Sequence, residues 1–159
     1  MLGSKDMGNK IIKLFLRLAI SLSFLSAVAD RLGMWRPEVS VWGNWDKFLS
    51  YTGNINAWLP DSFIPFVGSA ATIAEVIFAF FLLLGFKTEL FAKLSGILLL
   101  IFALSMTFST GIKSAFDASV YSASAAAFAL GVMKVKFLEL DCLFKNTRSK
   151  YKFTGFKYR

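Results

Sequence analysis

Four long blocks of apolar residues dominate the chain, and short polar segments separate them. The blocks fall at about residues 11–33, 62–85, 88–111 and 114–133. Each is close to the roughly 20 residues that an α-helix needs to cross the hydrocarbon layer of a membrane. The pattern therefore predicts an all-α protein, a four-transmembrane-helix bundle that forms one domain over residues 11–133.

Turn and cap residues mark the ends of these predicted helices. Gly33 and Gly85 are placed to end the first and the second helix. Only two residues separate Gly85 from Thr88, a candidate cap of the third helix, and so short a connection requires an antiparallel hairpin. Ser114 and Asp117 have the spacing of a capping box at the start of the fourth helix.

An aromatic segment joins the first two helices, and it holds all four tryptophans. Tryptophan concentrates at headgroup depth, where its ring and its N–H are both satisfied. Asn44 can cap a short helix within the segment. We expect an interfacial aromatic loop with a short helix, which serves either as a membrane anchor or as a lid over a ligand pocket. The tryptophans are Trp35, Trp42, Trp45 and Trp58.

The basic residues are distributed unevenly between the two sides of the predicted bundle. Fourteen of the 18 Lys and Arg residues fall on the side that holds both chain ends, which predicts cytoplasmic termini and an integral, multi-pass protein of the cell (inner) membrane. We interpret residues 1–10 as a mobile tail and residues 134–159 as a basic cytoplasmic tail that adheres to anionic headgroups. The net charge of +8 is thus explained by lipid contact, and we expect no nucleic-acid partner.

The start of the chain also fits a cleavable secretory signal. Lys10 and Lys13 precede an apolar run, and residues 27–29 (Ala-Val-Ala) have the small-x-small pattern of a cleavage site. Arg17 interrupts the run, which favours a retained anchor.

The composition excludes several classes of site. The sequence has no histidine, so we expect no haem or zinc ligation by His and no Ser-His-Asp triad. We expect no metal site. The single cysteine, Cys142, cannot form a disulfide within the chain.

The sharpest candidate for chemistry is Glu75, an acid near the middle of the second apolar block. A carboxylate at that depth costs about 2.5–3.5 kcal/mol on insertion scales, so it has to be paired, protonated or facing a wet cavity. Arg17 is the candidate partner within the first block. The alternative is that Arg17 extends to the interface while Glu75 stays a neutral acid bonded to a hydroxyl.

A second group of candidates lies at the outer end of the first helix. Asp30 and Arg31 occupy this end, next to the aromatic segment. They are either solvated at the interface or line the mouth of a cavity beneath Trp42 and Trp45. The predicted ligand-binding residues are Arg17, Asp30, Trp42, Trp45 and Glu75, and Glu75 is also the candidate catalytic proton acceptor.

Several stretches together resemble the DoxX family of small four-helix membrane proteins, over about residues 11–133. The resemblance implies the four-helix fold and, through the related DoxD proteins, a link to thiosulfate:quinone oxidoreductase chemistry. The cofactor so implied is a quinone, and the partner is a redox subunit. The stretches are Leu14-Phe15-Leu16-Arg17-Leu18-Ala19-Ile20, Phe24-Leu25-Ser26-Ala27-Val28-Ala29-Asp30-Arg31, Trp42-Gly43-Asn44-Trp45, Ala74-Glu75 and Leu82-Leu83-Leu84-Gly85-Phe86-Lys87-Thr88.

Three classes of function are consistent with these observations. The first is a redox-linked membrane subunit that binds a quinone or couples a partner oxidoreductase to the quinone pool, without a self-contained catalytic motif. The second is a non-enzymatic membrane anchor or assembly protein, in which the polar residues only pack helices. The third is a small-solute transporter, which four short helices would form only as a homo-oligomer.

Overall fold

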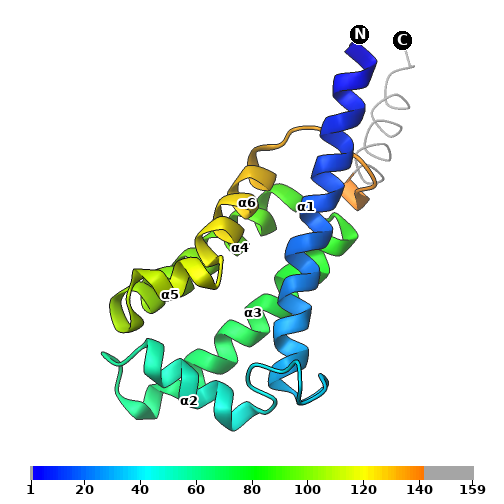
Figure 1. Cartoon of the computed structure of the whole chain (residues 1–159). Helices are drawn as coiled ribbons and strands as arrows, with labels where there is room; N and C mark the ends of the chain where they lie inside the picture. The colour runs from blue at the N-terminus through cyan, green and yellow to red at the C-terminus, as the bar shows by residue number, and fades with distance from the viewer. Residues whose placement is uncertain (1, 142–159) are drawn as a thin grey trace, which may run out of the picture.

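A computed structural model describes residues 2–141 of the chain, and these residues form helices and connecting segments with no β-strand. Figure 1 shows their arrangement. Most of the predicted basic tail, with Cys142, lies outside the described residues. The elements are α1 (Leu2–Arg31), α2 (Trp45–Ile55), a 3₁₀ turn (Asp61–Phe63), α3 (Ile64–Leu84), α4 (Thr88–Thr110), α5 (Ile112–Asp117) and α6 (Val120–Val132).

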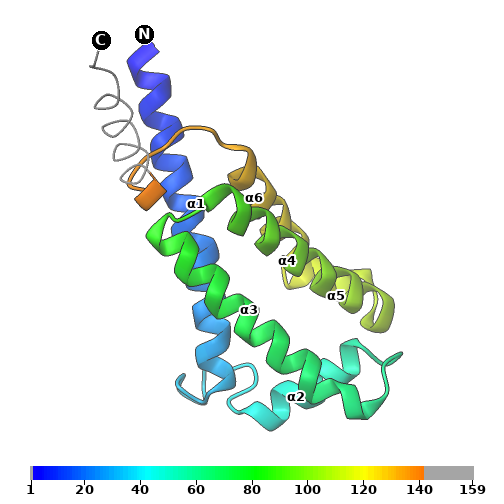
Figure 2. The same ribbon diagram turned by 180° about the vertical axis from the view of Figure 1, so that it is seen from behind.

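The helices pack in two pairs, α1 with α3 and α4 with α6, and α3 also contacts α4. Both views show α2 at one end of the molecule, while the start of α1 and the segment that follows α6 lie at the other (Figures 1 and 2). We call these the α2 end and the N-terminal end. Among the described residues, three stretches are long and apolar enough to cross a membrane, namely Asp6–Arg31, Asp61–Leu84 and Thr88–Thr110.

The first helix is longer than the sequence predicted. It begins at Leu2 rather than near Ile11, so residues 2–10 of the predicted mobile tail belong to the helix. The reason is that no proline interrupts this stretch, and adding a turn to an existing helix is far easier than starting a new one. An ion pair between Lys10 and Asp6, four residues apart, lies on this extension.

The fourth apolar block is not one continuous helix. It is divided into α5 and α6 at Ala118 and Ser119, where Ser119 has a left-handed backbone with φ of 55°. The predicted capping box does not form, because Asp117 pairs with Lys113 instead of bonding back to the start of the helix. By itself α6 is shorter than the three long helices, so four membrane crossings do not follow from helix length.

The short helix predicted after Asn44 is present as α2. Asn44 caps it, because the Asn44 side chain accepts a hydrogen bond of 2.9 Å from the amide of Lys47. The helix runs through Gly53 and ends at Ile55. The helix buries Phe48, Thr52 and Ile55. The face that carries these three residues therefore packs against the rest of the bundle.

Two apolar clusters form the core. The larger one lies between α1, α3, α4 and α6, and the smaller one joins the end of α2 to α4 and α5. Small side chains let the helices approach closely, as is common in membrane bundles. The larger cluster contains Ile20, Phe24, Ala79, Leu82, Ala92, Ala127 and Leu130, and the smaller contains Ile55, Met106 and Ala115.

Gly85 is required both by its backbone and by its neighbours. It ends α3 with φ of 67°, in the left-handed region, and Asp141 donates its amide to the Gly85 carbonyl at 3.3 Å. A Cβ atom here would lie 2.6 Å from Nη2 of Arg17 and 2.7 Å from Cα of Glu139. The chain that follows α6 thus passes directly over Gly85.

We expect Gly85→Ala to lower the free energy of unfolding by about 2–4 kcal/mol, because the left-handed backbone and the crowding both add cost. The measurement is the temperature at which purified protein in detergent loses its monomer peak in size-exclusion chromatography. Gly8→Ala is the control, since nothing lies within 4 Å of its added Cβ. Equal melting of the two variants would contradict the prediction.

Candidate functional site

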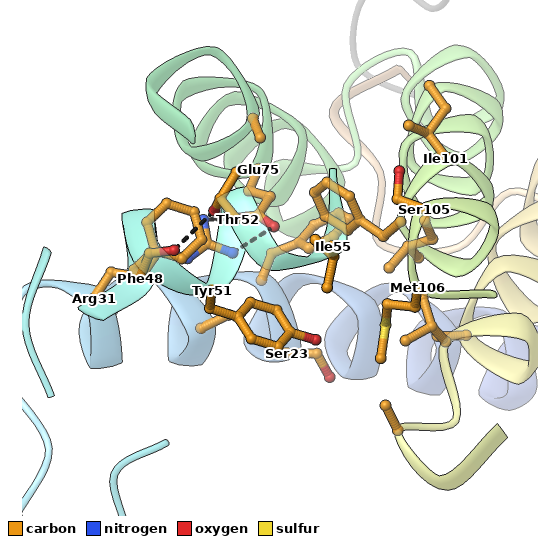
Figure 3. A pocket seen from close by; sticks show the side chains of 18 of the residues that line it. Ser23, Arg31, Phe48, Tyr51, Thr52, Ile55, Glu75, Ile101, Ser105 and Met106 are labelled. Carbon is orange, nitrogen blue, oxygen red and sulfur yellow. Dashed lines mark hydrogen bonds and ion pairs between the residues drawn. The ribbon is translucent and has the colours of Figure 1, made fainter. Parts of the chain in front are cut away.

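A cavity of about 550 Å³ lies between the two helix pairs and under α2. Residues from α1, α2, α3, α4, α6 and the α5–α6 junction line it, together with Trp42 from the segment before α2. Figure 3 shows Arg31 and Glu75 in one part of this cavity and Ser105 and Met106 in another. The lining is mostly apolar, so the cavity is suited to an apolar molecule with a polar group at one position.

The polar group of the cavity wall is an ion pair between Arg31 and Glu75. Arg31 is the last residue of α1, and Glu75 lies in the middle of α3. Nη1 of Arg31 contacts Oε2 of Glu75, and Nη2 donates to Oε1 at 3.0 Å (Figure 3). The side chains are only 4% and 2% exposed. Nη1 also donates to Oγ1 of Thr72 at 2.8 Å.

Glu75 is therefore buried inside the bundle, as its position predicted, but its partner is Arg31 and not Arg17. Both carboxylate oxygens accept from the guanidinium. A bidentate pair of this kind is the strongest arrangement available to a buried carboxylate. The role of Glu75 as a proton acceptor stays a prediction.

Aromatic rings enclose the Arg31 guanidinium. Its Cζ lies 4.1 Å from the centre of the Phe48 ring and 5.3 Å from that of Trp42. The position of Phe48 depends on Gly68 of α3, because a Cβ atom there would lie 3.2 Å from the Phe48 ring and 2.8 Å from Leu49. Glycine at this position lets α2 pack closely on α3.

Asp30 positions Trp42 and does not line the cavity. Its carboxylate accepts hydrogen bonds from the amides of Val41 at 2.9 Å and Trp42 at 3.0 Å, and from the hydroxyl of Ser40. The amide of Gly43 adds a longer contact of 3.4 Å. Neither of the two predicted environments describes Asp30, which is 5% exposed and bound to the backbone.

Two buried donors at this end of the cavity have no acceptor among the described residues. They are Nε of Arg31 and Nε1 of Trp42, and both residues line the cavity. A buried N–H group without a hydrogen bond is costly, so such groups are uncommon in proteins. Neither nitrogen atom has appreciable exposed surface, so an acceptor atom of a ligand reaches them only after a neighbouring side chain shifts.

Some of the polar residues elsewhere in the cavity bond within the protein. Oγ of Ser105 donates to Oδ1 of Asn56 at 3.1 Å, and Nδ2 of Asn56 donates to the Thr52 carbonyl at 2.9 Å. Tyr51 also lines the cavity, and burial raises the pKa of its phenol. The hydroxyl of Tyr51 thus stays protonated near neutral pH.

Arg17 belongs to a second network, at the N-terminal end. It is 2% exposed and donates to the carbonyls of Leu82 (2.9 Å) and Leu83 (3.0 Å) in α3. It also donates to those of Phe137 (3.0 Å) and Leu138 (2.9 Å) after α6. Arg17 does not line the cavity, and it joins three parts of the chain.

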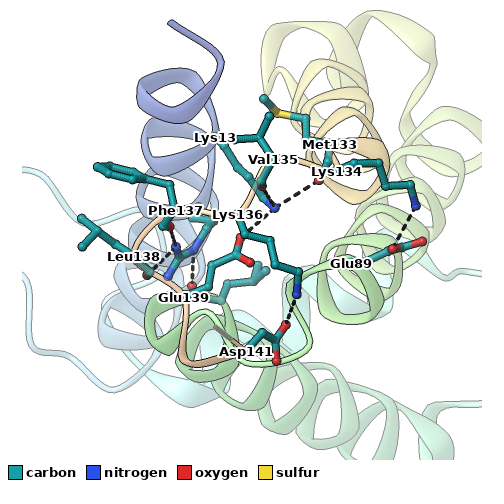
Figure 4. A network of polar contacts seen from close by, with 12 residues as sticks. Lys13, Glu89, Met133, Lys134, Val135, Lys136, Phe137, Leu138, Glu139 and Asp141 are labelled. Atoms are coloured by element: carbon teal, nitrogen blue, oxygen red, sulfur yellow. Dashed lines mark hydrogen bonds and ion pairs between the residues drawn. The ribbon is translucent and has the colours of Figure 1, made fainter. Parts of the chain in front are cut away.

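Lys13 extends this network (Figure 4). Its Nζ forms a buried ion pair of 2.7 Å with Glu139 and donates to the carbonyls of Met133 (3.1 Å) and Val135 (2.6 Å). The segment 133–141 is thus held across the N-terminal end of the bundle. We call it the C-terminal strap.

Of the five predicted ligand-binding residues, Trp42 and Glu75 line the cavity. Trp45 does not, and its ring packs on Phe48 with centroids 5.2 Å apart. Phe48 and Tyr51 line the cavity as well, although they were not among the predicted residues. The helical spacing of Phe48, Tyr51 and Ile55 on α2 is a signal that could have found them, since it places them on one face.

Comparison of this chain with known protein families, with curated proteins and with solved structures returned no match.

Proposed function

We propose that this chain is an integral inner-membrane protein that crosses the bilayer four times, with α5 and α6 together making the fourth crossing. The break at Ser119 is compatible with this, because non-helical backbone at membrane depth is tolerated beside a cavity, and Ser119 lines one. The basic residues near Lys13 and the C-terminal strap favour a cytoplasmic N-terminal end. The resemblance to the DoxX family supports the same topology.

The function that we propose is binding of a lipophilic quinone, as the membrane subunit of a quinone-linked oxidoreductase. The observation that carries it is the apolar cavity of about 550 Å³ with its charged and donor groups gathered near Arg31. A quinone has the matching shape, an apolar ring and tail with hydrogen-bond acceptors at the ring. A partner redox subunit supplies the electrons in this proposal, as the DoxX resemblance implies.

Glu75 has a restricted part in this proposal. Both of its oxygens are occupied by Arg31, so uptake of a proton by Glu75 requires the ion pair to open first. We therefore propose that the main role of Arg31 and Glu75 is to shape and polarise the cavity. Proton acceptance by Glu75 stays a prediction.

We expect the wild-type protein, extracted gently from membranes, to retain quinone, and Ala71→Phe to reduce the retained amount about tenfold. Ala71 lines the cavity from α3, and a phenyl ring there occupies the ligand's space, at a cost typical of overpacking. The measurement is quinone per protein, by organic extraction and mass spectrometry.

Ala70→Phe is the matched control for this experiment. Ala70 is the preceding residue of the same helix, is exposed, and does not line the cavity. The Ala70→Phe variant should retain as much quinone as the wild type does. Quinone missing from the wild type, or equally present in both variants, would count against quinone binding in the cavity.

A membrane anchor or assembly protein is the second candidate. It is favoured by the network at the N-terminal end, where Lys13, Arg17 and Glu139 hold the chain together without lining the cavity. This function predicts a partner protein that copurifies equally with wild type and Ala71→Phe.

A further inference from the structure

We propose that the ligand is read by its head group, through a neutral carbonyl oxygen that accepts hydrogen bonds from Nε of Arg31 and Nε1 of Trp42. The inference rests on the proposed function, because it takes a ligand in this cavity as given. It adds the chemistry of the group recognised, namely uncharged and hydrogen-bond accepting, and the two atoms that recognise it.

The first argument is the hydrogen-bond inventory of the Arg31 side chain. A guanidinium has five N–H groups. Three of the four on Nη1 and Nη2 bond Glu75 and Thr72, whereas Nε has no acceptor within the described part of the chain. Nε1 of Trp42 is in the same state. Since both groups are donors, their missing partner has to be an acceptor atom.

The second argument is that both donors are fixed before a ligand arrives. Glu75 and Thr72 hold the guanidinium on one side, and the Phe48 ring covers it at 4.1 Å. Asp30 holds the backbone of Trp42 through its amide, and the Trp42 ring packs on Phe48 and Tyr51 at 5.5 and 5.8 Å. The donors are thus held in place, and a covering side chain has to shift for a ligand atom to reach them, because neither nitrogen has appreciable exposed surface.

The third argument concerns charge. Among the described residues, the buried charged side chains at this end are Arg31, Glu75 and Asp30, so the two carboxylates outnumber the single guanidinium. An anionic head group would meet net negative charge in a medium of low dielectric. A neutral carbonyl avoids this repulsion and still satisfies both donors, which argues against a fatty acid or a phosphate as the ligand.

The part of the cavity around Asn56 offers little to a head group. Asn56, Ser105 and Thr52 bond one another there, so a ligand gains little by displacing them. We therefore place the head group beside Arg31 and Trp42 and the apolar tail along the remaining, mostly apolar, wall.

The test uses the full chain in detergent and three probes with alkyl tails of nine or ten carbons: decylubiquinone, decylbenzene and decanoate. Trp42→Phe removes the Nε1 donor and keeps an aromatic ring. We expect it to weaken decylubiquinone binding about tenfold, the loss of one buried hydrogen bond, and to leave decylbenzene binding unchanged. Bound decylubiquinone should also show a carbonyl stretching band at lowered frequency, and this lowering should diminish in the variant.

Trp45→Phe is the matched control, because Trp45 packs on the same Phe48 ring without lining the cavity. It should bind as the wild type does. Arg31→Lys, which keeps the charge beside Glu75 but lacks Nε, should weaken decylubiquinone as Trp42→Phe does.

The outcomes separate this inference from the proposed function. Tight decylubiquinone binding that is equal in Trp42→Phe and Trp45→Phe, with an unchanged carbonyl band, would overturn the head-group assignment and leave quinone binding intact. Decanoate binding more tightly than decylubiquinone would overturn the neutral head group. Absence of decylubiquinone binding to the wild type would overturn both proposals.

Discussion

Glu75→Leu should lower the free energy of unfolding by about 3–5 kcal/mol, because it leaves the Arg31 guanidinium buried without its counter-charge. The expectation follows from the exposed fractions of the two side chains, 4% for Arg31 and 2% for Glu75. Thr72 retains one hydrogen bond to the guanidinium, which replaces little of the lost interaction. The measurement is the midpoint of heat-induced loss of the folded monomer in detergent.

The double variant Arg31→Met/Glu75→Leu distinguishes a buried charge from a simple loss of packing. Apolar residues of similar volume often replace a buried ion pair without loss of stability, so the double variant should recover most of the midpoint that Glu75→Leu loses. A double variant that is less stable than Glu75→Leu would show that the ion pair is not the reason for the effect.

Arg17→Met should have the second large effect, lowering the free energy of unfolding by about 2–4 kcal/mol. Four backbone carbonyls lose a charged donor at once, those of Leu82 and Leu83 in α3 and two in the C-terminal strap. The strap should then separate from the bundle. Faster hydrogen exchange at the Asp141 amide, which bonds the Gly85 carbonyl, together with a lower heat midpoint, is the readout.

Lys10→Met is the matched control for Arg17→Met. Lys10 lies on the same helix and pairs with Asp6 at the surface, and exposed pairs of this kind contribute about 0–1 kcal/mol. If Arg17→Met behaved as Lys10→Met does in both measurements, the strap would be held by other contacts.

Most of the helices could be predicted from the sequence because their signals are local. The lengths of the apolar blocks, the Asn44 cap and the glycine at position 85 each act over a few residues, and the structure has α2, α3 and α4 within a few residues of the predicted bounds. The break at Ser119 could not be predicted, because serine favours no left-handed backbone and small residues continue on both sides.

The partner of Glu75 could not be predicted for a different reason. Which arginine it meets depends on how far α3 is displaced along α1. The first predicted helix ends at Gly33 and the second begins at Ser62. If these two residues lay side by side, Glu75 would lie opposite Ile20, near Arg17. In the structure Arg17 meets Leu82 and Arg31 meets Glu75, so α3 is displaced along α1, and no periodicity in the sequence encodes such a displacement.

The C-terminal strap was also beyond prediction. Residues after Met133 have no apolar period, and only the basic character of this stretch is visible in the sequence. The buried ion pair between Lys13 and Glu139 joins residues far apart in the chain. Long-range contacts of this kind depend on the packed arrangement and not on local pattern.

The missing side chain at Gly68 has a consequence for hydration. Because α2 rests directly on the α3 backbone there, the Phe48 ring reaches the Arg31 guanidinium and excludes solvent from it. One methyl group at position 68 would lift the ring and admit water to the charged pair. The exclusion of water from this ion pair thus depends on glycine at position 68 of the neighbouring helix.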